Sequence, residues 1–182
     1  MSRLRAIESS DASGKTKELL DIVKGKFGMV PNMTRVMANS PVVLEGYLGL
    51  AGALGNGTLN AQIREQIALI TAQANQCDYC LAAHTAIGKL VGLSDQQIIS
   101  SRGGQGSSAR ATAALIFARQ VLDGKGQVSD DAIREVREAG FTDGEIAEII
   151  AHVALNVLTN YFNKATEVDI DFPKASSVKA SR

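Results

Sequence analysis

Apolar residues recur at intervals of three and four along most of the chain, the spacing that places them on one face of an α-helix. The first run of this kind contains Leu19, Leu20 and Val23 and stops at Gly28. Glycine often follows the last turn of a helix, because it adopts the left-handed conformation without strain. The pattern therefore predicts a first helix from about Ser13 to Lys26.

Residues that favour helix starts mark the next elements. Pro41 follows Ser40, and a serine before a proline is typical of a cap followed by the first helical position. A long helix is expected from there to Leu54. Because residues 48–57 include four glycines, this helix is weak on propensity and must either pack closely or end early.

Cap residues and polar breaks in the middle of the chain predict three more helices. Asn60 caps a helix that ends in the polar stretch 73–76, and the next helix begins near Cys77 and runs to Val91. Ser94 with glutamine three positions later forms a capping-box pattern, which opens a short helix.

The last part of the chain begins with a glycine- and serine-rich stretch, 102–108, which we expect to be a flexible joint. Helical patterns follow at 109–122, 129–139 and 142 to about 168, each beginning near a serine or threonine. The tail, 172–182, is small, polar and basic, and we expect it to fray.

These patterns predict an all-α fold, since no alternating strand pattern of convincing length occurs. The residues on both sides of the glycine joint are too apolar to stand alone. We therefore expect a single domain over 1–182, with a core of about 14–173 and a flexible tail at 174–182. Helices this apolar often bury a remaining face against another subunit, so we also expect a homo-oligomer.

Composition argues against several classes of function. Nineteen Lys plus Arg balance nineteen Asp plus Glu, aromatic residues make up 4% and tryptophan is absent, so nothing favours a nucleic-acid or anionic-membrane surface. The first fifteen residues carry both charges and lack the apolar stretch of a signal peptide. We expect a cytoplasmic protein that binds neither nucleic acid nor a membrane.

The candidate chemistry centres on the two cysteines, Cys77 and Cys80. On a helix, Cys77, Cys80 and His84 fall within an arc of roughly 60°, so the two sulfurs can bridge and the imidazole lies one turn beyond them. Glu65 would lie roughly 18 Å from Cys77 on one unbroken helix. A chain reversal at Asn75 instead places Glu65 opposite His84 on two antiparallel helices.

This set of side chains suits thiol chemistry. A thiol attacks a peroxide or a disulfide as the thiolate, and a free cysteine with a pKa of about 8.5 is mostly protonated at neutral pH. A helix N-terminus and a neighbouring imidazole favour the thiolate. His84 can accept the thiol proton, Glu65 can orient His84, and a sulfenic acid on one cysteine can condense with the other cysteine.

Other interpretations stay open at this point. Two cysteines at this spacing also occur in zinc sites, where Glu65 or His152 would supply the fourth ligand, and as inert buried thiols. Glu65 by itself is typical of a solvated helix residue. His152 is a candidate pocket residue, but its apolar surroundings are more typical of a satisfied core or interface histidine. Tyr79 is either a hydrogen-bond donor to a peroxide oxygen or a surface tyrosine at a helix start.

The arrangement Glu65, eleven residues, Cys77-Asp78-Tyr79-Cys80, three residues, His84 resembles the signature of the carboxymuconolactone decarboxylase-like superfamily, in its alkylhydroperoxidase D branch. Residues 27–32 (Phe-Gly-Met-Val-Pro-Asn) resemble the entry segment of those proteins. Residues 160–173 resemble their closing segment, so the resemblance covers most of the chain.

The resemblance implies an alkylhydroperoxidase D-like helical bundle, assembled into trimers or hexamers, with thiol-dependent peroxidase activity and no metal, haem or other cofactor. By the family pattern, Cys80 is the nucleophile that forms the sulfenic acid, Cys77 is the resolving partner and proton donor, and Glu65 with His84 is the proton relay. The residues alone leave open which sulfur attacks. The best studied type of member has a histidine where this chain has Tyr79.

The expected partners are a hydroperoxide substrate and a thiol or dithiol electron donor of unknown identity. The alternatives are a partner-dependent disulfide reductase, a decarboxylase of the carboxymuconolactone type and a non-enzymatic helical oligomer that binds zinc or senses redox state. Decarboxylation ranks low, because the decarboxylating members generally lack the paired cysteines that this chain has.

Overall fold

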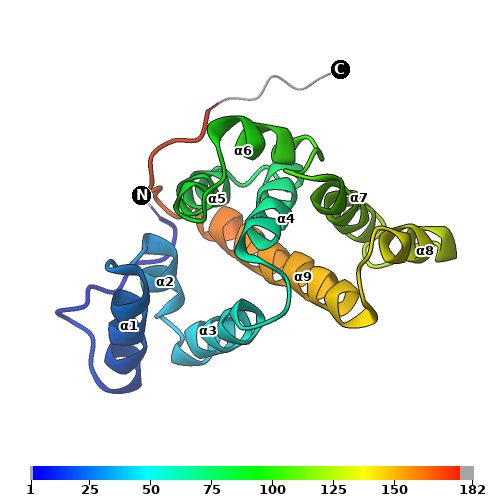
Figure 1. Ribbon diagram of the computed structural model, residues 1–182. Coiled ribbons are helices and arrows are strands. Elements are labelled where there is room, and N and C mark those ends of the chain that lie inside the picture. Colours follow the sequence, from blue (N-terminus) through cyan, green and yellow to red (C-terminus); the bar gives the residue numbers. More distant parts are fainter. Residues whose placement is uncertain (1, 177–182) are drawn as a thin grey trace.

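The computed structural model describes residues 2–176, and within that range it contains nine helices and no strands (Figure 1). The predicted all-α class is confirmed. In chain order the helices are α1 (Gly14–Phe27), α2 (Asn32–Met37), α3 (Pro41–Gly55), α4 (Ala61–Ala74), α5 (Asp78–Leu90), α6 (Asp95–Arg102), α7 (Ala109–Asp123), α8 (Asp130–Glu138) and α9 (Asp143–Thr166).

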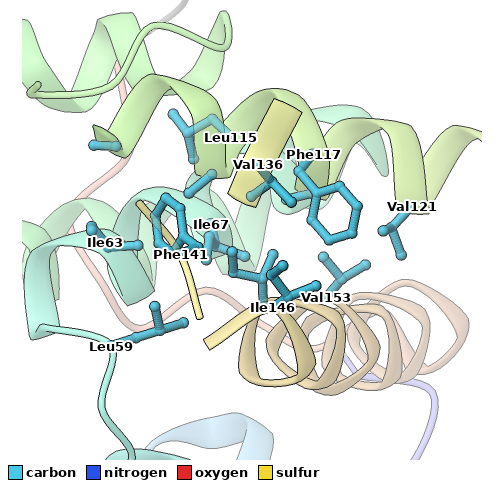
Figure 2. Packing of buried hydrophobic residues seen from close by; sticks show 14 of the residues in the cluster. Leu59, Ile63, Ile67, Leu115, Phe117, Val121, Val136, Phe141, Ile146 and Val153 are labelled. Carbon is cyan, nitrogen blue, oxygen red and sulfur yellow. The ribbon is translucent and has the colours of Figure 1, made fainter. Parts of the chain in front are cut away.

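Helix α4 is the centre of the packing, because it contacts α5, α6, α7 and α9. The long helix α9 crosses the molecule beside α4, with α1–α3 toward one end and α7 and α8 toward the other (Figure 1). One hydrophobic core lies among α4, α7, α8 and α9 and includes Ile67, Phe117 and Val153 (Figure 2). A second core joins α1–α3 to the start of α5 and contains both cysteines.

Side-chain caps fix the helix starts that the sequence predicts. At five helices an oxygen of the cap side chain accepts a hydrogen bond from the backbone N–H three residues on, and these caps are Asn60, Ser94, Ser108, Ser129 and Thr142. The capping box between Ser94 and Gln97 is present. Such a cap satisfies an N–H group that the helix itself leaves without a partner, so the predicted starts agree with the structure within one or two residues.

Two elements differ from the expectation. Helix α2 was not predicted, because its six residues between Pro31 and Pro41 are too few to show a helical period. Helix α3 does not end early, although Leu44 is its only buried residue. Its side chains Val42 and Leu50 are 77% and 40% exposed, so the close packing expected for this helix is not supplied within the chain.

The glycine- and serine-rich stretch 102–108, expected to be a flexible joint, is instead hydrogen-bonded to α4. Oε1 of the fully buried Gln66 accepts hydrogen bonds from the backbone N–H of Ser107, at 2.7 Å, and from the hydroxyl of Ser101, at 3.2 Å. A buried amide held by several partners fixes the loop against the helix.

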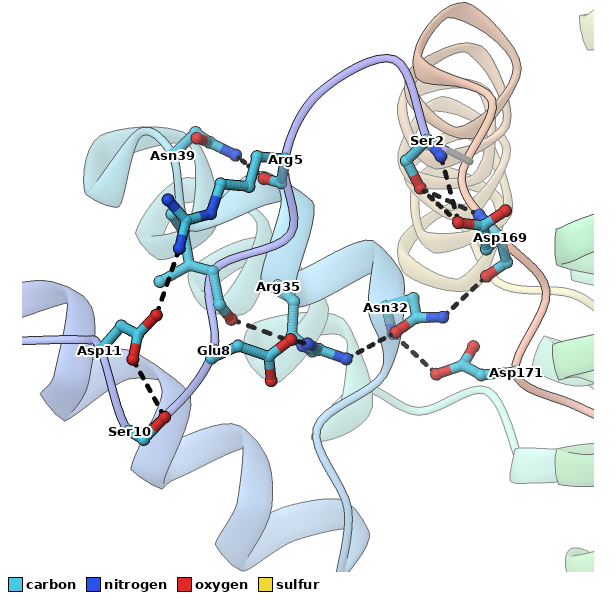
Figure 3. Close-up of polar contacts among 11 residues, drawn as sticks. Ser2, Arg5, Glu8, Ser10, Asp11, Asn32, Arg35, Asn39, Asp169 and Asp171 are labelled. Carbon is cyan, nitrogen blue, oxygen red and sulfur yellow. Dashed lines mark hydrogen bonds and ion pairs between the residues drawn. The ribbon is translucent and has the colours of Figure 1, made fainter.

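The segment after α9 folds back over α2 and α5. Asn32 donates from its backbone N–H to Oδ2 of Asp171 at 2.7 Å and from its side chain to the carbonyl of Asp169 at 2.9 Å (Figure 3). The N-terminal segment is also tied down, through an ion pair between Glu8 and Arg35. Arg102 donates to the carbonyl of Ser176 at 2.6 Å. The rest of the tail expected to fray, 177–182, lies outside the described residues.

No helix in the described part of the chain is both long enough and apolar enough to span a lipid bilayer.

Candidate active site

The chain reverses between α4 and α5, and α9 holds the reversal in place. Gln76 adopts a left-handed conformation, with φ 54°, so the chain turns away from the axis of α4 at this residue. Asn75 donates from its side chain to Oδ1 of Asn160 at 2.9 Å, and Lys164 donates to the carbonyl of Asn75 at 2.7 Å. The reversal therefore occurs where the polar stretch predicts it, and it makes α4 and α5 an antiparallel hairpin.

The hairpin brings Glu65 of α4 against His84 of α5. Oε2 of Glu65 lies 2.8 Å from Nδ1 of His84, and the two side chains are only 17% and 21% exposed. Because a carboxylate only accepts hydrogen bonds, Nδ1 carries the hydrogen and donates it, which leaves Nε2 for other partners. The interpretation of Glu65 as a solvated helix residue is wrong.

The two cysteines lie at the N-terminus of α5 and form a disulfide, with their Cα atoms 5.3 Å apart. Cys77 is the cap of this helix, and its Sγ accepts a hydrogen bond from the backbone N–H of Cys80 at 3.3 Å. Both residues are buried, at 1% and 3% exposure. The sulfur pair therefore lies at the positive end of the helix dipole, the position that favours a thiolate after reduction.

A cavity of about 320 Å³ opens beside the disulfide. Cys80 and His84 both line this cavity, whereas Cys77 does not. The walls are mostly apolar and come from α1, the α1–α2 loop, α2, α3, α5, α9 and the segment after α9, with Phe27, Met29, Met33, Ile87, Leu90 and Phe172 among them. A small apolar molecule in the cavity would therefore lie against the Cys80 side of the disulfide.

Tyr79 is part of the cavity wall, so its interpretation as a surface tyrosine at a helix start is wrong. It is 5% exposed, its hydroxyl oxygen accepts a hydrogen bond from the backbone N–H of Met33 at 3.2 Å, and its ring meets Phe172 edge to face with centroids 5.7 Å apart. Burial raises the pKa of Tyr79 above its ordinary value, and the Asp171 carboxylate adds to this effect. The phenol therefore stays neutral at physiological pH.

His152 of α9 is buried but not satisfied, in contrast to the expectation. It is 6% exposed, and its Nε2 has no hydrogen-bond partner among the described residues. Burial lowers the pKa of His152, and the nearby Arg64 guanidinium lowers it further against the opposing effects of Glu148 and Glu65. His152 is not among the residues that line the cavity at Cys80.

Asn163 of α9 contacts Cys80, although its spacing from Cys80 in the sequence does not mark it as a site residue. Its Nδ2 lies 3.3 Å from Sγ of Cys80 and 3.3 Å from Sδ of Met33, and the residue is 4% exposed. A signal for such a residue exists in the sequence. Polar residues recur every three or four positions through the apolar helix α9 and are all buried, namely His152, Asn156, Thr159, Asn160, Asn163 and Thr166.

Known proteins share both sequence and fold with this chain. The sequence profile of the Carboxymuconolactone decarboxylase family matches residues 41–124, which include the hairpin, the cysteines and His84. A peroxidase-related protein with an alkylhydroperoxidase AhpD core from Ralstonia eutropha JMP134 is 26% identical, with a TM-score of 0.84 over 93% of this chain and 92% of that chain. A peroxidase-related protein from Silicibacter sp. TM1040 is 25% identical, with a TM-score of 0.81 over 92% and 91%.

The family profile and the two peroxidase-related structures support the carboxymuconolactone decarboxylase-like superfamily, in its alkylhydroperoxidase D branch, for this chain. Members of this family are enzymes, which supports enzyme status for this chain in a broad sense, and the two relatives above are peroxidase-related. The debrominase Bmp8, solved in complex with 2,3,4-tribromopyrrole, shares the fold at 19% identity, with a TM-score of 0.78 over 92% of this chain and 91% of that chain. No curated protein matches the sequence.

The four residues of the superfamily signature lie together in one site. Glu65, His84 and the two cysteines meet at the α4–α5 hairpin, while the described residues contain no group of three or more His, Cys, Asp and Glu placed to hold a metal ion. In this state the two sulfurs are bonded to each other.

Proposed function

We propose that this protein is a thiol-dependent peroxidase that reduces organic hydroperoxides through the Cys77–Cys80 disulfide. One observation carries the proposal: Cys80, disulfide-bonded to Cys77, faces an apolar cavity together with His84, whose other side contacts Glu65. A redox pair, a proton acceptor and space for an apolar substrate thus meet at one point.

In the first step, the reduced Cys80 gives its proton to Nε2 of His84, which Glu65 orients through Nδ1. The thiolate attacks the terminal oxygen of the hydroperoxide, so a sulfur–oxygen bond forms and the oxygen–oxygen bond breaks. The departing alkoxide takes the proton from His84 and leaves as the alcohol. Cys80 is now a sulfenic acid.

In the second step, the sulfur of Cys77 attacks the sulfur of Cys80. The disulfide forms, the sulfur–oxygen bond breaks, and the hydroxide leaves as water with the proton of the Cys77 thiol. Two electrons from the two thiols have then reduced one hydroperoxide to one alcohol and one water. An external thiol or dithiol reduces the disulfide by exchange and completes the cycle.

The geometry favours Cys80 over Cys77 as the attacking sulfur. Cys80 lines the cavity and Cys77 does not, so a substrate in the cavity reaches Cys80 first. Cys77 caps α5 and does not line the cavity, so we assign it the role of the resolving thiol. Tyr79 supports the wall by holding the backbone of Met33, and we assign it no proton transfer.

The cavity walls favour substrates that carry an apolar body. Aromatic and aliphatic side chains contribute most of the lining, and such surface binds a substrate by removing its apolar area from water. We therefore expect aromatic or alkyl hydroperoxides to react faster than hydrogen peroxide, which cannot use these walls.

A second candidate reaction is reductive dehalogenation of a small aromatic molecule, which the ring-lined cavity also fits. In that reaction the two thiols would become the disulfide, a carbon–bromine bond would be replaced by carbon–hydrogen, and bromide would leave. The debrominase Bmp8 shares only the fold with this chain, so this reaction ranks second.

We also propose that the chain works as a homo-oligomer, a trimer or hexamer, in the cytoplasm. The apolar side chains that α3 leaves exposed favour burial against another copy, and sedimentation of the purified protein measures the subunit number. A reducing compartment supplies the thiols that the cycle consumes.

The test is a turnover assay with an excess of dithiothreitol and one of three oxidants: cumene hydroperoxide, tert-butyl hydroperoxide or hydrogen peroxide. The proposal predicts peroxide consumption that requires Cys80 and is fastest with the bulkier organic substrates. Tribromopyrrole in the same assay tests the second candidate by bromide release. Bromide release without peroxide turnover would overturn the peroxidase assignment.

A further inference from the structure

The amide of Asn163 is aimed at two sulfur atoms. Its Nδ2 lies 3.3 Å from Sγ of Cys80 and 3.3 Å from Sδ of Met33. A thioether only accepts hydrogen bonds, so the nitrogen end of the amide must face this pair and the oxygen end must face away. Asn163 thus donates directly to the sulfur that lines the cavity.

The other end of the same amide has no partner. Oδ1 of Asn163 is buried and accepts no hydrogen bond among the described residues. An orphaned buried acceptor lowers stability, so an apolar side chain of similar size would suit this position better if packing were its only role. The amide is therefore best explained by what its donor end does at Cys80.

We propose that Asn163 is a catalytic residue whose side-chain N–H stabilises the Cys80 thiolate and thereby helps make Cys80, rather than Cys77, the attacking sulfur. The inference rests on the proposed function and adds a residue from α9 to Glu65, His84 and the two cysteines of the α4–α5 hairpin. A hydrogen bond to the charged form of a group favours that form. In an apolar surrounding the effect is larger than in water, because solvent does not compete for the sulfur.

The two thiols would then be stabilised by different donors. Cys77 receives the backbone N–H of Cys80 at the helix start, while Cys80 receives the Asn163 amide. The backbone donor is present whatever the side chain at position 163. Substitution of Asn163 therefore changes the ionisation of Cys80 specifically.

The test measures the ionisation of the Cys80 thiol without any peroxide. In a Cys77→Ser background Cys80 is the one remaining cysteine, and its rate of alkylation by iodoacetamide is followed against pH on reduced protein. Asn163→Ala and Asn163→Asp are compared with Asn156→Ala. Asn156 is a matched control, because it is a buried asparagine of the same helix that donates to the carbonyl of His152 and not to sulfur.

We expect Asn163→Ala to move the midpoint of the profile to higher pH and to lower the alkylation rate at pH 7 by about tenfold, which corresponds to about one pKa unit. Asn163→Asp keeps the shape of the side chain but adds negative charge, so its midpoint should move further. Mere loosening of the fold would instead expose the thiol and raise the rate at every pH. Asn156→Ala should leave the midpoint in place.

An unchanged midpoint in Asn163→Asp overturns the inference, and this variant decides the question if Asn163→Ala does not fold. The outcome is separable from that of the proposed function. If the Asn163 variants shift the alkylation midpoint as expected but hydroperoxides do not oxidise the wild-type protein, the role of Asn163 at the thiolate is retained. The peroxidase assignment is then lost.

Discussion

Oε2 of Glu65 and Nδ1 of His84 lie 2.8 Å apart, although 19 residues separate them in the chain. The contact exists because the chain reverses at Asn75 and because α9 holds that turn through Asn160 and Lys164. It fixes which nitrogen of His84 carries hydrogen, and so leaves Nε2 to exchange protons at the cavity. The proposed proton relay thus depends on the hairpin and on a helix from the far end of the chain.

The first prediction concerns this contact. Glu65→Gln removes the charge that orients His84 and stabilises its protonated form, so the thiol should react only at higher pH, and peroxide-driven oxidation at pH 7 should slow at least about tenfold. Stopped-flow oxidation of the reduced protein across pH measures both effects. Glu135→Gln, on the exposed part of α8, is the matched control and should behave as wild type. An unchanged pH profile in Glu65→Gln would show that no such relay operates.

The second prediction separates the two sulfurs. Cys80→Ser should abolish peroxide consumption, because the sulfur that lines the cavity is gone. Cys77→Ser should still reduce about one equivalent of hydroperoxide and then stop at a sulfenic acid on Cys80, because no thiol is left to resolve it. Intact mass after reaction with a sulfenic-acid-selective reagent measures this. The reverse pattern in the two variants would assign the attack to Cys77.

The third prediction concerns Tyr79. Tyr79→Phe leaves the backbone N–H of Met33 without its acceptor in a buried position, which should lower the free energy of unfolding by about 1–3 kcal/mol. Because burial raises the pKa of the phenol, Tyr79 is neutral before and after substrate binding, and the pH profile of the thiol should not change. Urea unfolding and alkylation profiles test the two parts separately. A shifted thiol profile would give Tyr79 a part in proton transfer.

The fourth prediction concerns alkaline stability. Burial raises the pKa of Tyr47 from 10.0 to about 12, with Glu65 adding to the effect. Between these values the unfolded chain loses the phenol proton while the folded chain keeps it. The contribution of Tyr47 to the free energy of unfolding is therefore fully present below pH 10 and is lost as pH rises toward 12. The fall is at most about 1.4 kcal/mol per pH unit for this group.

Urea unfolding at pH 8 and pH 11 measures that fall. Tyr47→Phe should lose about 1 kcal/mol less than wild type over this interval, because it has no phenol to ionise. Tyr161→Phe is the control, since the Tyr161 side chain is 60% exposed. An identical fall in wild type and Tyr47→Phe would mean that Tyr47 ionises alike in the folded and unfolded chains.

The helices could be predicted from the sequence because each signal is local. Apolar spacing gives the length of a helix, and residues such as Asn60 and Thr142 give its start, since the cap bonds to a backbone group only three positions away. Helix α2 escaped because six residues between prolines show no period. The stretch 102–108 looked flexible because the Gln66 amide that holds it comes from another helix.

The candidate site likewise has residues that could be predicted from local spacing and residues that could not. Cys77, Cys80, His84 and Glu65 could be assembled from spacing, because one reversal relates them all. The surroundings of Tyr79 could not, since Phe172 reaches it from the far end of the chain. The contact between Asn163 and Cys80 spans 83 residues, and no local pattern reports which polar face of α9 lies over the sulfur. His152 stays a predicted supporting residue of the site, although it does not line the cavity.

The most direct test of the peroxidase account is a count of free thiols, together with the intact mass, on reduced and metal-free protein before and after one equivalent of cumene hydroperoxide. The account predicts the loss of both thiols and a mass decrease of about 2 Da, which is the signature of an intramolecular disulfide. Persistence of both thiols with an unchanged mass would contradict it.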